Sequence, residues 1–101
     1  MLLLERKYSV KKLTQELLLN SNFFNKLGYI QDDKGRYSRQ IHPELKISFN
    51  VYSEVDPLLG TEVEAYANDM LGFTGYWMDL KDFVTQFQNV LPPQAAEYLQ
   101  Q

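Results

Sequence analysis

Residues 45–52 read LKISFNVY, a stretch in which apolar and polar side chains alternate at every position. Successive side chains of a β-strand point to opposite faces of the sheet, so a period of two predicts a half-buried strand. The alternation places four apolar side chains on one face: Leu45, Ile47, Phe49 and Val51. This is the clearest strand in the chain, and the other elements are placed around it.

The next strand is expected to follow a loop marked by proline and glycine. Residues 61–67 are the expected antiparallel partner, with Val63 turned inward and Glu62 and Glu64 turned outward. A helix over 61–71 is the alternative, because Glu, Ala, Met and Leu favour helices. We favour the strand.

Two other regions predict strands. Asp32–Gly35 has turn chemistry, since short carboxylates bond the local backbone and glycine supplies a positive φ. An extended stretch that opens at Tyr29 is therefore expected to form a hairpin with a strand over 36–41. Residues 72–78 predict a short strand with a bulge or a close backbone approach near Gly75.

Two regions have the apolar spacing of helices. A helix over about 9–19 is predicted, followed by a short helical segment that Gly28 ends. A second helix is predicted over 79–91, with Asp79 as its N-cap and Asp82 as the partner in an imperfect capping box. Two prolines stop this helix, and the residues after them are expected to form one more helical turn or a tail.

These elements define the expected fold. We predict a single α+β domain over residues 1–101, in which helices at about 9–27 and 79–91 pack on one face of an antiparallel sheet of four to five strands. Hydrophobic residues make up 45% and aromatic residues 14% of the chain, which suffices for one aromatic-rich core. The chain contains no cysteine, so disulfides are excluded.

Charge is distributed unevenly along the chain, whose net charge is −3. Residues 1–46 carry nine basic and five acidic side chains, whereas residues 47–101 carry one basic and eight acidic. The split predicts either a dipolar surface or charges that cancel across the strands of one sheet. The apolar run Met1–Leu4 is too short for a signal peptide or a membrane span, so we expect a cytoplasmic location and no membrane partner.

Residue types that catalysis needs are sparse. The single histidine, His42, precedes a proline and has no cysteine or second histidine with which to share a metal. No phosphate-binding loop or nucleophile elbow is present. We therefore expect no catalytic residue, no metal, no cofactor and no enzyme activity. An enzyme built on Glu62, Glu64 and Asp69 is an alternative.

A basic hairpin offers another alternative. Four residues there could contact phosphates and stack on bases: Lys34, Arg36, Tyr37 and Arg39. The pI near 5.0 argues against nucleic acid, and cations around a hairpin also guard an edge strand against aggregation. A nucleic-acid-associated or regulatory protein therefore ranks second.

Aromatic and acidic residues together predict a surface that binds another protein. One side of the expected sheet gathers the candidates Tyr52, Glu54, Glu62, Glu64, Tyr66, Tyr76 and Trp77. Tyrosine and tryptophan bury much area with few rotatable bonds, and an acidic rim attracts a basic partner. Trp77 fits the core as well as it fits this surface, and a homodimer through the aromatic face is an equal alternative to a foreign partner.

The second half of the chain resembles a known class of protein. Strand, loop and strand are followed by Gly72-Phe73-Thr74-Gly75 and by a helix that opens at Asp79-Leu80 and contains Phe83 and Phe87. This order is similar to that of small bacterial toxin-immunity proteins, in pattern rather than through a diagnostic motif. The resemblance implies a non-catalytic inhibitor that blocks its partner sterically, and it assigns no binding residue. The size and acidity also resemble those of small phage-encoded inhibitors of host defence systems.

Overall fold

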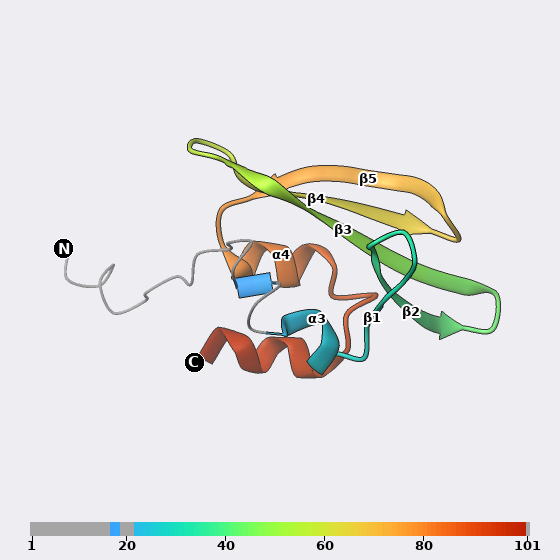
Figure 1. The fold of residues 1–101 in the computed structure, drawn as a ribbon. Helices are drawn as coiled ribbons and strands as arrows, with labels where there is room; N and C mark the ends of the chain where they lie inside the picture. The colour runs from blue at the N-terminus through green and yellow to red at the C-terminus, as the bar shows by residue number, and fades with distance from the viewer. Residues whose placement is uncertain (1–16, 19–21, 101) are drawn as a thin grey trace.

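A computed structural model describes residues 17–18 and 22–100 of the chain as an α+β fold built on one five-stranded antiparallel sheet (Figure 1). The strand order is β1-β2-β3-β4-β5, so each strand pairs with its neighbour in the sequence. The strands are β1 (Ile30–Gln31), β2 (Tyr37–His42), β3 (Leu45–Asp56), β4 (Gly60–Ala67) and β5 (Met70–Trp77). The helices are α3 (Phe23–Lys26), α4 (Leu80–Gln86) and the 3₁₀-helix η1 (Pro93–Gln100).

The alternation predicted for β3 is confirmed, and it sets one face of the sheet against the core. Phe49 is fully buried and lies opposite Ala65, while Val51 lies opposite the equally buried Val63. Residues directly opposite one another in an antiparallel pair share a face, so β3 and β4 build this buried face together. The strand predicted over 61–67 is confirmed, and the helical alternative is wrong.

Phe49 connects this buried face to the helices. Its ring centroid lies 5.2 Å from that of Phe24 in α3, 5.9 Å from that of Phe83 in α4 and 5.1 Å from that of Phe87. In Figure 1, α3 and α4 lie beneath the sheet. Edge-to-face and offset ring pairs add about 0.5–1.5 kcal/mol each to the free energy of burial, so the aromatic core holds these elements together.

The helix predicted over 79–91 is shorter in the structure. Asp79 caps α4 as expected, because its Oδ1 accepts from the backbone N–H of Asp82 at 2.8 Å. The helix ends at Gln86, and residues 87–90 continue as tight turns. Pro92 disfavours helical geometry at Leu91, the residue before it, and the carbonyl of Val90 accepts a bond from the Tyr29 hydroxyl at 2.8 Å.

The predicted N-terminal helix falls mostly outside the described residues. Leu17 and Leu18 are helical, whereas 9–16 and 19–21 are not described. The short segment after them is confirmed as α3, and Gly28 follows it with φ of 90°. None of the helices in the described part of the chain is long and apolar enough to cross a membrane.

The glycines of β5 have other roles than predicted. Ala65 faces Phe73 whereas Tyr66 faces Leu71, so the extra residue of the bulge is Gly72 and not Gly75. The close approach expected near Gly75 is present, but the group that approaches Gly75 is a side chain and not backbone. A Cβ there would lie 2.8 Å from Cη2 of the Trp77 indole.

Candidate protein-binding surface

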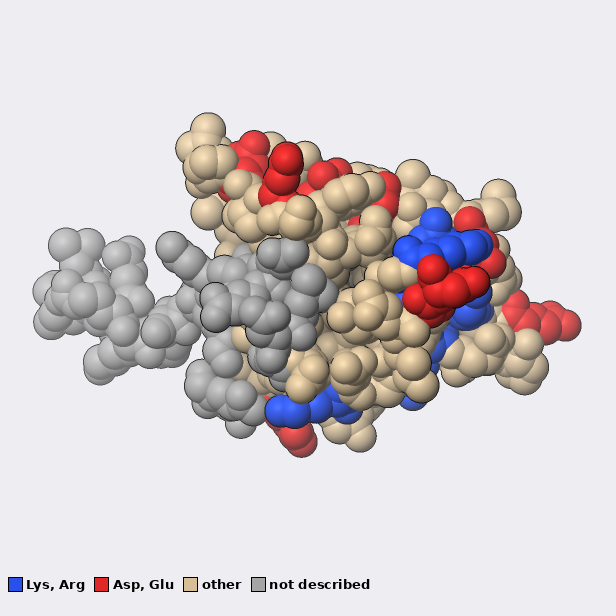
Figure 2. All heavy atoms as spheres, in the orientation of Figure 1, with Lys and Arg blue, Asp and Glu red and all other residues tan. Residues whose placement is uncertain are grey.

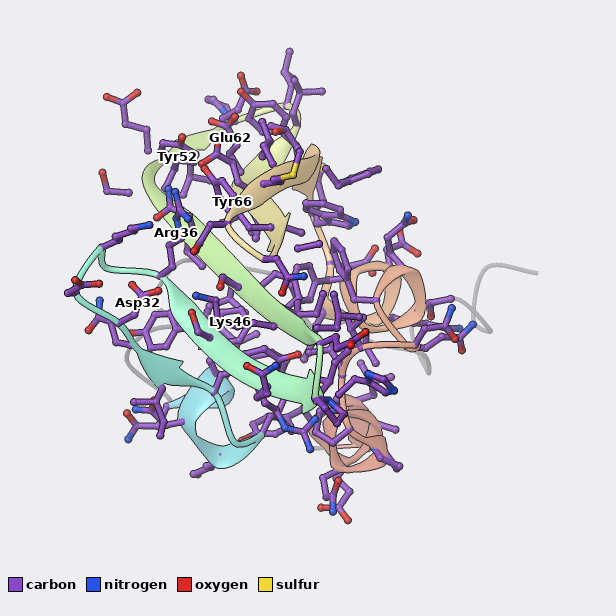
Figure 3. The ribbon with its side chains drawn as sticks, turned by 90° about the vertical axis from the view of Figure 1, so that its right-hand side faces the viewer. Asp32, Arg36, Lys46, Tyr52, Glu62 and Tyr66 are labelled. Carbon is purple, nitrogen blue, oxygen red and sulfur yellow. The ribbon has the colours of Figure 1, made fainter. Side chains whose placement is uncertain are left out.

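The face of the sheet turned away from Phe49 carries polar side chains, and we call it the outer face. Pairing places Asn50 opposite Glu64 and Glu62 opposite Tyr76 on this face. Figure 3 shows Arg36, Tyr52 and Tyr66 on the side of the sheet away from α4. The sheet therefore separates an aromatic core from an outer face that carries tyrosines and carboxylates.

Glu64 organises the centre of the outer face. Its Oε1 accepts from Asn50 Nδ2 at 3.1 Å and from the Tyr66 hydroxyl at 2.8 Å, and it also bonds the side chain of Tyr52. Burial raises the pKa of Glu64, but these three hydrogen bonds and the charge of Arg36 outweigh burial and hold the pKa below its usual value. In return, the bond to Glu64 raises the pKa of Tyr52 to about 12.

A second tyrosine and carboxylate pair lies beside the β3–β4 hairpin. The negative charge of Glu62 raises the pKa of Tyr76, with contributions from burial, from Asp56 and from a hydrogen bond to Glu62. Glu54, Asp56, Glu62 and Tyr76 help to line a hollow of about 250 Å³ here. The tyrosine–carboxylate patch is defined as these residues together with Tyr52, Glu64 and Tyr66.

The other end of the outer face is basic but internally paired. Asp69, in the β4–β5 turn, lies 3.8 Å from Lys34, 3.5 Å from Arg36 and 3.3 Å from Lys46. The hydrogen bond from Lys46 and the three positive charges lower the pKa of Asp69. The Arg36 guanidinium also lies 3.6 Å from the centroid of the Tyr66 ring. Figure 2 shows cations gathered near the β1–β2 turn and carboxylates along the edge with the β3–β4 hairpin.

The turn between β1 and β2 is fastened to the outer face. Asp32 accepts from the backbone N–H groups of Lys34 and Arg36 and from the Ser38 hydroxyl, which lies 2.7 Å from the Ser48 hydroxyl on β3. Burial raises the pKa of Asp32, but these bonds prevail and lower it. The turn predicted at Asp32–Gly35 is therefore confirmed, and it holds the basic end in place.

Most of the predicted protein-binding residues come together in the structure. Tyr52, Glu54, Glu62, Glu64, Tyr66 and Tyr76 all belong to the tyrosine–carboxylate patch. Trp77 does not, because it follows Tyr76 in the strand and points to the opposite face. It is 8% exposed, and its ring lies 5.4 Å from those of Phe83 and Phe87. Trp77 is thus a core residue.

No protein-family model, curated protein or solved structure matches this chain.

The predicted nucleic-acid residues are divided between the two faces. Tyr37 stacks on Phe24 with ring centroids 5.2 Å apart, and Arg39 bonds the buried Tyr29. Lys34 and Arg36 are paired with Asp69 instead. Tyr37 and Arg39 are two residues apart in β2 and therefore share the core side, whereas Lys34 and Arg36 lie in the turn that precedes the strand.

The remaining chemical candidates also lie apart. Glu62 and Glu64 share the outer face, whereas Asp69 is held among cations at the β4–β5 turn. His42 is exposed at the end of β2, where its Nδ1 accepts weakly from the Glu44 N–H at 3.5 Å. Within residues 17–18 and 22–100, no group of three or more His, Cys, Asp or Glu side chains could hold a metal ion.

Two residues of the outer face have partners that the sequence does not indicate. Alternation places Asn50 on the polar side of β3, but only the register shows that it lies opposite Glu64. Asp69 is a candidate for catalysis in the sequence, whereas in the structure it contacts three cations from the β1–β2 turn and from β3. The asymmetry of charge along the chain was the available signal, but only the pairing of strands shows which charges meet.

Proposed function

We propose that this protein is a non-catalytic binding module that docks its tyrosine–carboxylate patch on a basic surface of another protein and blocks that protein sterically. An inhibitor or immunity-type protein of the cytoplasm would act in this way. The observation that carries the proposal is the group of three tyrosines held by two carboxylates, Glu62 and Glu64, on one open face of the sheet.

Order within the patch favours binding. Tyr52 and Tyr76 are 38% and 44% exposed, so each has ring area left to bury. Their hydrogen bonds to Glu64 and Glu62 restrict the side chains before a partner arrives. Association then costs less conformational entropy, which otherwise amounts to about 0.5–1.5 kcal/mol for each immobilised side chain.

Charge on the patch favours a basic partner. Lys34, Arg36 and Lys46 are paired with Asp69, whereas among the described residues no cation is paired with Glu54 or Glu62. Unpaired carboxylates around exposed tyrosines attract Lys and Arg and speed the encounter with a basic surface. The same carboxylates repel nucleic acid.

The test is affinity capture from a lysate of the source organism with matched baits, followed by calorimetry on the captured protein. We expect one basic protein to be retained in stoichiometric amount by the wild-type chain. Reversing two patch charges with Glu54→Lys/Glu62→Lys should weaken binding on the order of 100-fold, since lost charge pairs at interfaces typically cost a few kcal/mol.

The control bait is Asp33→Lys/Glu97→Lys, which makes the same change of net charge at two exposed positions outside the patch. It should bind the partner as the wild-type chain does. Equal binding by the Glu54→Lys/Glu62→Lys bait, or retention of nucleic acid alone, would contradict the proposal.

A further inference from the structure

In the described part of the chain, the outer edge of β5 is unpaired. β5 is the last strand of the sheet and pairs with β4 along one edge, and none of the described residues pairs with its other edge. Such an edge presents a row of N–H and C=O groups to an incoming strand. Apolar side chains of β5 are also exposed to solvent: Met70 is 73%, Leu71 55% and Phe73 43% exposed.

This edge lacks the usual protection against pairing. Natural sheets guard their edges with charges, prolines, bulges or very short strands. Residues 70–77 contain neither a charged residue nor a proline, and their bulge at Gly72 leaves 73–77 in regular pairing with β4. The opposite edge differs, because β1 has only two residues and is followed by Asp32-Asp33-Lys34.

We propose that the β5 edge pairs with the β5 edge of a second copy of the chain, so that two sheets join into one antiparallel sheet. A two-fold axis sets each strand antiparallel to its own copy, so a charge near the axis would lie close to the same charge on the other copy. The absence of charge from 70–77 therefore suits a second copy in particular.

A register centred on Gly75 fits the side chains best. It brings the partner's strand alongside Phe73, so pairing covers part of a side chain that β4 leaves 43% exposed. The partner's Trp77 lies opposite Phe73 in this register but stays packed in its own core. The two-fold axis is normal to the sheet, so both outer faces lie on the same side of the dimer. This inference does not rest on the proposed function, since it uses neither Glu54 nor Glu62.

The first measurement is sedimentation equilibrium of the full chain from about 1 μM to 1 mM, a range that covers moderate and weak association. We expect the average mass to rise from 11.9 kDa towards twice that value. A mass that stays at 11.9 kDa throughout would overturn the proposal.

A charge-exchange experiment locates the interface. Thr74 is exposed, and in the proposed register it lies diagonally from the partner's Thr74 at about 7–8 Å. Thr74→Lys and Thr74→Glu should each weaken the dimer, because like charges then approach each other across the axis, and their equimolar mixture should recover it. Glu64 lies opposite Thr74 in β4 of each copy in all of these samples, so recovery in the mixture reports the contact between copies. Circular dichroism checks that both variants are folded.

Two controls separate this inference from the proposed function. Ser53→Lys places the same charge at an exposed position of the interior strand β3 and should dimerise like the wild-type chain. Glu54→Lys/Glu62→Lys, which disables the tyrosine–carboxylate patch, should also dimerise. If Thr74→Lys dimerises as strongly as the wild-type chain, or if the mixture of charged variants does not recover the dimer, the β5 edge is not the interface.

Discussion

Glu64 is the residue on which the order of the outer face depends. A carboxylate only accepts hydrogen bonds, so Asn50, Tyr52 and Tyr66 all keep a partner while Glu64 is ionised. Its lowered pKa means that its contribution to stability is present above the ordinary value of 4.5 and is lost as the pH falls through the lowered value. The raised pKa of Tyr52 has the opposite consequence, because the contribution is present below 10.0 and is lost as the pH rises through about 12.

Replacing Glu64 with glutamine should therefore destabilise the fold in a window of pH. We expect Glu64→Gln to lose about 1 kcal/mol of unfolding free energy near pH 7, a small value because the site is half exposed and screened. Urea unfolding over a series of pH values measures this difference. It should shrink on the acid side of 4.5 and on the alkaline side of 10.0. A difference that is the same at every pH would mean that the charge of Glu64 has no role.

The face on which a residue lies could be predicted from sequence, whereas its partners could not. Alternation along 61–67 correctly turned Val63 inward and Glu64 outward. By the same rule, neighbouring residues of a strand point to opposite faces, so Tyr76 and Trp77 cannot share a face. In the structure Tyr76 is 44% exposed and Trp77 is 8% exposed. Which donors meet Glu64 depends on the register between strands, and a single strand's pattern carries no information on register.

At the scale of elements, strands were predicted more accurately than helix ends. The strand at 45–52 has a period that no helix shares, and the structure extends it to Asp56. The helix over 79–91 was overestimated because Phe87, Val90 and Leu91 keep helical spacing. Successive tight turns also place residues three apart on the same side of the chain. One such turn is closed by the Val90 N–H, which donates to the Phe87 carbonyl at 3.0 Å. Apolar spacing alone cannot distinguish these turns from a helix.

The β3–β4 hairpin depends on a glycine at its last turn position. Gly60 has φ of 96°, and a Cβ there would lie 2.6 Å from the Trp77 carbonyl carbon and 2.9 Å from the Met78 nitrogen. We expect Gly60→Ala to cost at least about 2 kcal/mol of unfolding free energy, from positive φ and from overlap with backbone that cannot move aside. The midpoint of urea unfolding measures the loss.

Gly35→Ala is the matched control for this prediction. Gly35 also has a positive φ of 84°, but an added Cβ would have no atom within 4 Å. This variant should lose only the conformational part, about 1 kcal/mol. Equal losses in the two variants would show that the approach of Gly60 to β5 is not close enough to matter.

For the whole molecule, the order of strands determines how the charges of the sequence are arranged in space. In a sheet where every strand pairs with its neighbour in sequence, position across the sheet follows position along the chain. The basic first half and the acidic second half meet at Asp69, whose single carboxylate in the β4–β5 turn lies within 4 Å of Lys46 on β3 and of Lys34 and Arg36 from the β1–β2 turn. Both interpretations of the charge split hold in part, since opposite charges meet at Asp69 and stay separate at the β3–β4 hairpin.

Phe49 carries the contact between the sheet and the helices, so the stability of the whole fold should depend on it. Its ring meets Phe24, Phe83 and Phe87, and Phe→Ala changes in cores cost about 3–5 kcal/mol. Small domains are stable by only about 5–15 kcal/mol, so Phe49→Ala should remove a large share of the unfolding free energy.

Emission from the single tryptophan, Trp77, reports this transition because its ring packs in the same core. Ile30→Ala is the control, since Ile30 is equally apolar in character but 74% exposed, and it should change stability by no more than about 0.5 kcal/mol. The reason for the contrast is burial, because an exposed side chain leaves little apolar area to return to water on unfolding. If Phe49→Ala unfolded at the same urea concentration as Ile30→Ala, the helices would not be held to the sheet through this ring.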